Sequence, residues 1–253
     1  MVIHLTTGEV WRLAVLFAAG TGAGFINVLA SGGSMLTLPI LIFSGLDPVA
    51  ANATNRIGIL MENVTATYAF HHRGLVKIGK GSKLALWAIP GAVLGAITSV
   101  HISNLWFQRV LVIILILSIV TIFLPRRVSK GERPDGHASP WLYPAMMGLG
   151  FYGGFIQLGA GFLLITALHH LLTSRLAQIN AYKTLIISLY TLPAILVYGW
   201  MGQIRWERAL AITMGGMVGA WLASRLALGR RGELLVKMVL AIMVLLMAAK
   251  LWI

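Results

Sequence analysis

The chain has 253 residues, of which 58% are hydrophobic and 11% are charged. Soluble domains usually carry about 25% charged residues, so this composition excludes a fully water-facing surface and predicts a polytopic membrane protein. The net charge of +13 comes largely from Lys and Arg in short loops, a pattern that orients membrane proteins. No basic face remains for nucleic acid, and the lack of cysteine excludes a disulfide framework and a thiol nucleophile.

The first apolar stretch is interrupted. Residues 13–30 carry no charge, and a shorter apolar piece follows at 35–45. Between them lie four small residues, Ser31, Gly32, Gly33 and Ser34.

A helix start follows at Asp47 and Pro48, because Asp is a favoured N-cap and Pro fits the first helical position. We expect this helix to end near His71, which gives a length of about 36 Å, enough to cross a bilayer. A basic loop at 73–83 then leads to two further spans at 84–100 and 105–124.

The polar stretch 125–140, which holds four Lys and Arg residues, is the natural boundary between two halves. The second half begins with residues 141–158, followed by a break at Gly159, Ala160 and Gly161. We expect the next segments at 162–172, at about 175–199 after a cap at Thr173 and Ser174, at 209–226 and at 234–253. Tryptophans near the segment ends are typical of interfacial anchors.

The two halves share landmarks in the same order. These pairs are Gly24-Phe25 with Gly150-Phe151, Asn52-Ala53 with Asn180-Ala181, Gly74 with Gly202, and Gly91-xxx-Gly95 with Gly215-xxx-Gly219. Internal duplication is common in secondary transporters. The sequence therefore predicts an all-α polytopic membrane protein of about eight transmembrane helices, with a first repeat at 1–124, a basic cytoplasmic linker at 125–140 and a second repeat at 141–253.

The relative orientation of the halves stays open. The basic segments 73–83 and 126–133 flank one pair of spans, so both are expected on the cytoplasmic side. If each interrupted stretch crosses the membrane once, the halves are parallel and Arg205 and Arg208 are cytoplasmic. If each stretch turns back, the halves are inverted and Arg230 and Arg231 are cytoplasmic.

Polar residues share one face of the helix that begins at Pro48. With a step of about 100° per residue, Asn52, Asn55, Arg56, Glu62 and Asn63 fall within an arc of about 120°. The helix after residue 174 has a similar face with Asn180 and Lys183, along with four hydroxyl-bearing residues, Thr184, Ser188, Tyr190 and Thr191. Charged groups at membrane depth usually face a cavity or a partner.

Two alternatives apply to this face. Arg56 can reach the membrane interface with its long side chain, or it can form a purely structural pair with Glu62. The occurrence of matching faces in both halves favours a central site.

The glycine breaks allow unwound backbone, which membranes tolerate only where it is buried or lines a cavity. The helices that start after each break aim partial positive charge at the gap, so with Arg56 and Lys183 the site is expected to favour an anion. The alternative is that these glycines only allow close helix packing. That alternative is the expected role of the Gly91-xxx-Gly95 and Gly215-xxx-Gly219 pairs.

Other chemistries find little support. The pairs His71-His72 and His169-His170 diverge by about 100° on a helix and lack carboxylates at ligand spacing, so no metal is expected. No phosphate-binding loop is visible, which argues against a nucleotide cofactor. An intramembrane hydrolase using Glu62 and a histidine lacks a recognisable constellation, and an accessory subunit leaves the matched polar faces unexplained.

The stretch GFINVLASGGSMLTLPILIFSGLDPVAANATNR and its echo GFYGGFIQLGAGFLLITALHHLLTSRLAQINAYKT resemble the twin signatures of the TauE/SafE sulfite-exporter family, within the 4-toluene sulfonate uptake permease group. The resemblance covers nearly the whole chain. It implies a multi-pass permease of the bacterial inner membrane that moves sulfite, organosulfonates or another small organic anion.

By motif position, the resemblance places the substrate site at Asn27, Ser31, Gly32, Gly33, Ser34, Asn52, Asn55, Arg56, Gln157, Gly159, Gly161, Asn180 and Lys183. Glu62 is the candidate proton carrier. We expect a secondary transporter rather than an enzyme, with no catalytic residue, metal or cofactor. The expected partners are a small sulfite-like anion and the lipid bilayer, and a homo-oligomer is compatible with this class.

Overall fold

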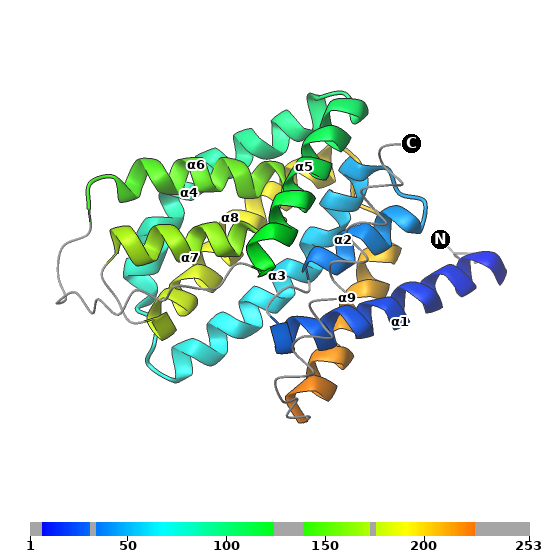
Figure 1. Cartoon of the computed structure of the whole chain (residues 1–253), viewed down its shortest axis with the longest axis horizontal. Helices are drawn as coiled ribbons and strands as arrows, with labels where there is room; N and C mark the ends of the chain where they lie inside the picture. The colour runs from blue at the N-terminus through cyan, green and yellow to red at the C-terminus, as the bar shows by residue number, and fades with distance from the viewer. Residues whose placement is uncertain (1–6, 31–33, 124–138, 173–175, 226–253) are drawn as a thin grey trace. The chain divides into compact units, whose positions relative to one another are not determined.

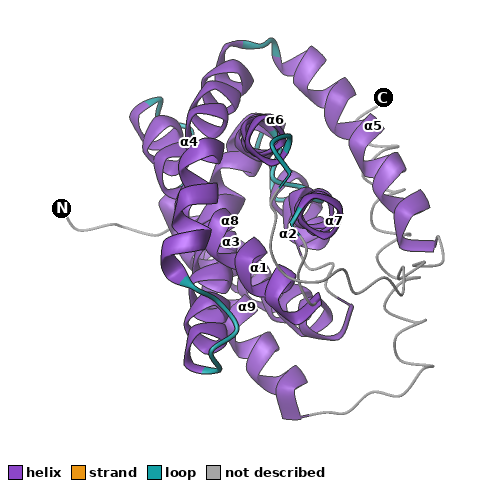
Figure 2. Ribbon diagram, turned by 90° about the vertical axis from the view of Figure 1, so that its left-hand side faces the viewer, coloured by secondary structure: helices purple, strands orange, loops and turns teal. Residues whose placement is uncertain are grey.

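The computed structural model describes residues 7–30, 34–123, 139–172 and 176–225. These residues form nine α-helices joined by loops, and no strand occurs among them (Figures 1 and 2). The prediction of an all-helical chain is confirmed for this part. The expected span at 234–253, most of the basic linker and the residues Ser31, Gly32 and Gly33 lie outside the described residues.

The helices of the first half follow the predicted order, and their bounds are α1 Thr7–Ala30, α2 Ser34–Phe43, α3 Pro48–His72, α4 Ile78–His101 and α5 Asn104–Phe123. The N-cap prediction is confirmed, because the Oδ1 atom of Asp47 accepts a hydrogen bond from the Ala50 N–H at 3.0 Å. One boundary was wrong. Helix α4 begins six residues before the expected residue 84, and Lys80 and Lys83 therefore lie on its first turns.

In the second half the helices are α6 Leu142–Phe155, α7 Ala160–Leu171, α8 Leu176–Trp200 and α9 Trp206–Arg225. The break was placed too late in the sequence. It occupies residues 156–159, where Ile156 is extended and Gly159 has a φ of 70° that favours glycine. Ala160 and Gly161 already belong to the first turn of α7.

The chain divides into two compact units, and each unit takes helices from both halves of the sequence. Unit 1 covers Met1–Gly58, Asn104–Leu124 and Gln203–Ile253, and so contains α1, α2, the start of α3, α5 and α9. Unit 2 covers Ile59–Ser103 and Pro125–Gly202, and so contains the rest of α3 together with α4, α6, α7 and α8.

In unit 1, glycines bring α1 and α9 into backbone contact. A Cβ atom on Gly24 would collide with the backbone of Gly216, and one on Gly215 would collide with the carbonyl of Phe17. The contacts advance in step along both helices, since Gly20 meets Ile212 and Gly24 meets Gly216. The two helices therefore run parallel at a distance that only small residues allow.

Unit 2 repeats this arrangement with α4 and α6. A Cβ atom on Gly91 would collide with the carbonyl of Met147, and one on Gly150 would collide with Ala88. Gly95 and Gly154 make the next contacts along the same pair of helices. The predicted packing role is confirmed for Gly91, Gly95, Gly215 and Gly219. Two other matched glycines, Gly74 after α3 and Gly202 after α8, have φ values of 68° and 66°.

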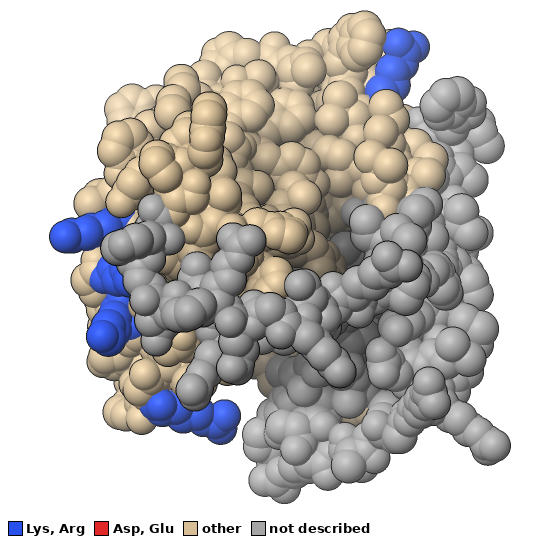
Figure 3. Space-filling model, turned by 60° about the vertical axis from the view of Figure 1, so that its left-hand side comes forward, with Lys and Arg blue, Asp and Glu red and all other residues tan. Residues whose placement is uncertain are grey.

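The surface agrees with the predicted membrane protein. Helices α4 and α8 are long and apolar enough to cross a bilayer. Their unit also exposes large apolar side chains such as Leu196, at 74% of its surface. Figure 3 shows Lys and Arg at the edges of a face that is otherwise uncharged among the described residues. The tryptophans predicted as interfacial anchors are all exposed, namely Trp11, Trp87, Trp106, Trp141, Trp200 and Trp206.

Candidate functional site

The first candidate cluster lies on the opening turns of α3, in unit 1. Asn52, Asn55 and Arg56 retain 2%, 5% and 0% of their exposed surface; we call these residues the α3 cluster. Their burial agrees with the polar face predicted from the sequence. On another face of this helix, the Oγ1 atom of Thr54 accepts a hydrogen bond from the Arg205 N–H at 3.1 Å. This bond holds the start of α3 against the loop before α9.

Arg56 is among the largest fully buried side chains among the described residues. It lies eight residues into α3, about 12 Å from the helix start. The alternative in which Arg56 reaches the interface is wrong, because the side chain has no exposed surface. Burial of a cation at this depth is energetically costly, which makes Arg56 a candidate site residue.

Beyond Arg56 the polar face of α3 is less buried. Glu62 and Asn63 are half-buried, and both belong to unit 2. The Asn63 side-chain N–H donates to the Ile59 carbonyl of the same helix at 2.7 Å. The Asn63 amide is therefore hydrogen-bonded within α3. Glu62 is the ionisable residue beside it on this face.

In unit 2, the hydroxyl groups of two tyrosines form hydrogen bonds with backbone carbonyls at the break between α6 and α7. The Tyr152 hydroxyl donates to the Leu158 carbonyl at 2.7 Å. The Tyr198 hydroxyl lies 3.0 Å from the Gly154 carbonyl and 3.3 Å from that of Phe155. The last carbonyls of a helix lack partners within it, so Tyr198 stabilises the end of α6.

Gln157 lies within this break and is 5% exposed. Its amide N–H donates to the Tyr190 hydroxyl at 3.2 Å. A Cβ atom on Gly153 would collide with the ring of Tyr190, so the glycine makes room for this side chain. Sequence reasoning missed the roles of Tyr152 and Tyr198. A buried tyrosine in an apolar span usually needs a hydrogen-bond partner, and that was the available signal.

The side chain of Lys183 on α8 lies beside the first turn of α7. A Cβ atom on Gly161 would lie 3.5 Å from the Cδ atom of Lys183, and the Lys183 ammonium donates to Asn180 Oδ1 at 3.5 Å. The start of α7 carries partial positive charge, so a second positive group near it favours an anion. We call Gln157, Gly159, Gly161, Asn180 and Lys183 the α7 cluster.

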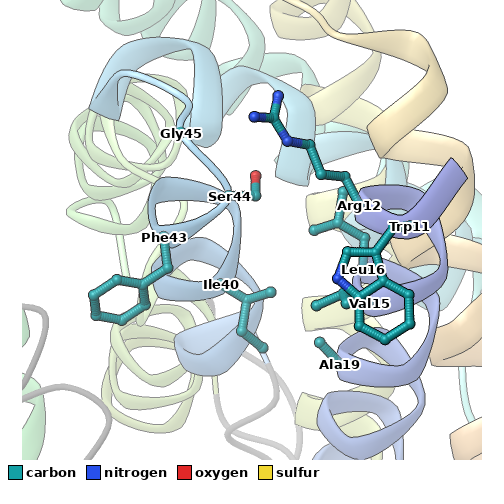
Figure 4. A pocket seen from close by; sticks show the side chains of 9 residues that line it. All are labelled: Trp11, Arg12, Val15, Leu16, Ala19, Ile40, Phe43, Ser44 and Gly45. Atoms are coloured by element: carbon teal, nitrogen blue, oxygen red, sulfur yellow. The ribbon is translucent and has the colours of Figure 1, made fainter. Parts of the chain in front are cut away.

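Both interrupted stretches turn back on themselves. Trp11 and Arg12 near the start of α1 line one pocket together with Phe43 and Ser44 at the end of α2 (Figure 4). In the second half, the N–H of Ser139 before α6 donates to the Leu171 carbonyl at the end of α7, at 3.0 Å. The two ends of each stretch are therefore neighbours.

Some predicted site residues are only partly described. Ser31, Gly32 and Gly33 lie outside the described residues. Asn27 belongs to α1 and Ser34 begins α2, but their side chains lie outside the described part. Within unit 2 the structure brings Gln157 to Tyr190, and Lys183 to Asn180 and Gly161.

The histidine pairs form no larger cluster with other candidate metal ligands. The ring centres of His71 and His72 are 6.5 Å apart, and those of His169 and His170 are 5.6 Å apart. Across the described ranges, no group of three or more His, Cys, Asp or Glu side chains could hold a metal ion.

Comparison with known proteins agrees with this membrane architecture. Residues 16–251 match the family described as sulfite exporter TauE/SafE. The chain is 27% identical over 240 residues to the probable membrane transporter protein YfcA of Escherichia coli K12, covering 94% of this chain and 89% of that protein. It is equally similar to a probable membrane transporter protein of Haemophilus influenzae, with coverage of 94% and 93%. No solved structure matches the chain.

Proposed function

The chain belongs to the sulfite exporter TauE/SafE family and is a membrane transporter, and we propose that it is a secondary transporter of small anions such as sulfite or organosulfonates. The proposal places it in the bacterial inner membrane as a multi-pass protein. The names of the relatives state that they are probable membrane transporters. The anion class rests on the residues of this chain and on the family description.

One observation carries the proposal, namely the complete burial of Arg56 on the same opening turns of α3 as the buried amides of Asn52 and Asn55. An anion that leaves water loses a large hydration energy, and a buried guanidinium with neighbouring amide donors can replace that hydration. Arg also suits an oxyanion, since its planar donors match two oxygens at once.

The α7 cluster supports the same chemistry in unit 2. It combines the N-terminus of a 12-residue helix, a half-buried ammonium on Lys183 and the amide of Gln157. Helix N-termini at interrupted segments bind the anionic groups of substrates in several transporter folds. We propose that the α3 cluster and the α7 cluster are equivalent halves of the transport machinery, with Glu62 carrying the coupled proton.

We further propose that the two repeats are inverted. Each interrupted stretch starts and ends at one level, as the Ser139–Leu171 bond illustrates, so an odd number of crossings remains in each half. Arg208 donates to the Ser44 carbonyl at 3.1 Å, which supports a position of this arginine beside the start of α3. The basic segment 73–83 follows the other end of α3, about 36 Å along the helix.

This topology predicts that Arg205 and Arg208 face the side opposite the cytoplasm, whereas Arg230 and Arg231 are cytoplasmic. Because the chain has no cysteine, single cysteines report accessibility without background. A membrane-impermeant maleimide should label Met201→Cys from outside the cell and Lys80→Cys only after permeabilisation. Labelling of both from the same side contradicts the inverted arrangement.

Flux into proteoliposomes tests the transport function. The wild-type protein should take up labelled sulfite and be inhibited by a sulfonate but not by a neutral amide of similar size. Arg56→Gln and Lys183→Gln should each lower the rate at least tenfold, since each removes a charge-assisted contact. Arg109→Gln, which changes an exposed arginine on α5, is the matched control. Unchanged flux in correctly inserted Arg56→Gln protein contradicts the proposal.

A further inference from the structure

Unit 1 contains a pocket of about 540 Å³ where the ends of α1 and α2 come together. Helix α1 has 24 residues and α2 has 10, and the pocket is lined by residues 11–19 of α1 and by residues 40–45 at the end of α2. The pocket lies between the first half of α1 and the end of α2, whose lining side chains stand opposite one another (Figure 4). Ligand pockets usually measure about 300–1,000 Å³.

The pocket has an apolar wall and a polar rim. The wall consists of aliphatic and aromatic side chains from both helices, namely Val15, Leu16, Ala19, Ile40 and Phe43. The rim carries Arg12 and Ser44 (Figure 4). A molecule that fits both surfaces needs an apolar part and an anionic or hydrogen-bonding end.

Two arginines from different helices lie near this rim, Arg12 in the pocket lining and Arg208 through its bonds to Ser44. The Nη1 atom of Arg208 on α9 donates to the Ser44 carbonyl at 3.1 Å and to its hydroxyl oxygen at 3.3 Å. Arg208 lies within electrostatic range of Arg12, Arg205 and Glu207. The glycine packing between α1 and α9 fixes the spacing of their side chains, so like charges stay close and attract an anion between them.

Exposed tryptophans place the rim at the depth of lipid head groups. Trp11 on α1 is 71% exposed and also lines the pocket, and Trp206 at the start of α9 is 54% exposed. Tryptophan concentrates at the interface between hydrocarbon and water. An apolar wall below this level and a cationic rim at it match the two parts of a phospholipid.

We propose that this pocket binds an anionic glycerophospholipid, with the phosphate at Arg12 and Arg208 and an acyl chain along the wall formed by α1 and α2. Basic pockets between membrane helices bind lipid head groups in this way. The site is independent of the α3 cluster and the α7 cluster.

The test measures retention of added lipid by the purified protein, using native mass spectrometry and thermal unfolding with phosphatidylglycerol, phosphatidylcholine or inorganic phosphate. Phosphatidylglycerol should bind and raise the unfolding temperature, whereas phosphatidylcholine and inorganic phosphate should bind at least tenfold more weakly. Arg12→Gln should weaken phosphatidylglycerol binding about fivefold, since one basic residue near an anionic lipid contributes about that factor. Arg12 is exposed, so this change leaves the core intact.

Two matched variants separate the contribution of the arginines to lipid binding from that of the apolar wall. Ala19→Leu narrows the apolar wall and should weaken lipid binding with both arginines in place. Ala14→Leu makes the same change at an exposed position of α1 that does not line the pocket, and it should bind as the wild type does. Equal retention of phosphatidylglycerol by wild type, Arg12→Gln and Ala19→Leu overturns the proposal. Equally tight binding of inorganic phosphate also overturns it, because the site then recognises a free anion.

Discussion

Replacement of Tyr198 by Phe tests how the break between α6 and α7 is held. The hydroxyl group of Tyr198 lies within hydrogen-bond reach of the Gly154 carbonyl and the hydroxyl of Ser99. It therefore connects α8 with α6 and with α4. The substitution removes one oxygen atom and leaves the buried aromatic ring in place, so the packing of unit 2 should change little.

The magnitude follows from the number of bonds lost. Tyr198 donates to the Gly154 carbonyl and lies within hydrogen-bond reach of the Ser99 hydroxyl, which makes two contacts across three helices. Hydrogen bonds between membrane helices average about 0.6 kcal/mol and reach about 1.7 kcal/mol. Loss of both should lower the free energy of unfolding by about 1–3 kcal/mol. For a chain of this size, the unfolding temperature should fall by about 2–12 °C.

The assay is a thermal scan of purified protein in detergent, followed by intrinsic tryptophan fluorescence. Tyr68→Phe is the control, because the same oxygen is removed from a side chain that is 66% exposed. The control should unfold within about 1 °C of the wild type. If Tyr198→Phe also unfolds within about 1 °C of the wild type, the tyrosine does not stabilise the break and the reasoning is refuted.

Three further predictions concern other elements. Asp47→Ala removes the cap of α3 and should cost about 1 kcal/mol, seen as an unfolding temperature lower by about 2–4 °C; an unchanged temperature contradicts the capping role. Gly91→Leu should abolish the monodisperse peak in size-exclusion chromatography, because its side chain meets backbone of α6, whereas Gly79→Leu has open space and should keep the peak. Glu62→Gln should remove the response of flux to a pH gradient and keep the response to membrane potential; a retained pH response excludes Glu62 as the proton carrier.

The sequence predicted the helices well where local chemistry sets their ends. Asp47 and Pro48 marked the start of α3, and the matched glycines Gly74 and Gly202 both lie in turns, after α3 and α8. The start of α4 was misplaced because Lys80 and Lys83 were assigned to a loop. Their long side chains extend outward while Gly81 and Leu84 of the same turns pack into unit 2.

Burial of the α3 cluster could be predicted from the helical period, because one polar face in an apolar chain must avoid lipid. The hairpin shape of each interrupted stretch could not. It depends on contacts between residues far apart in the sequence, such as Ser139 with Leu171. The number of Lys and Arg residues in each loop gives no information about such contacts. The grouping of helices from both halves into one unit also depends on contacts between distant residues. In unit 1, the glycines of α1 allow close packing against α9.

Binding of sulfite to purified protein, measured by titration calorimetry, tests the central claim about Arg56 most directly. The account predicts that Arg56→Gln weakens binding about 10-fold to 150-fold, which corresponds to the loss of one charged hydrogen-bonding contact worth about 1.5–3 kcal/mol. Arg56→Lys should retain part of the affinity because it keeps the charge, and Arg109→Gln should bind as the wild type does. Equal sulfite affinity in folded Arg56→Gln and wild-type protein would contradict the account.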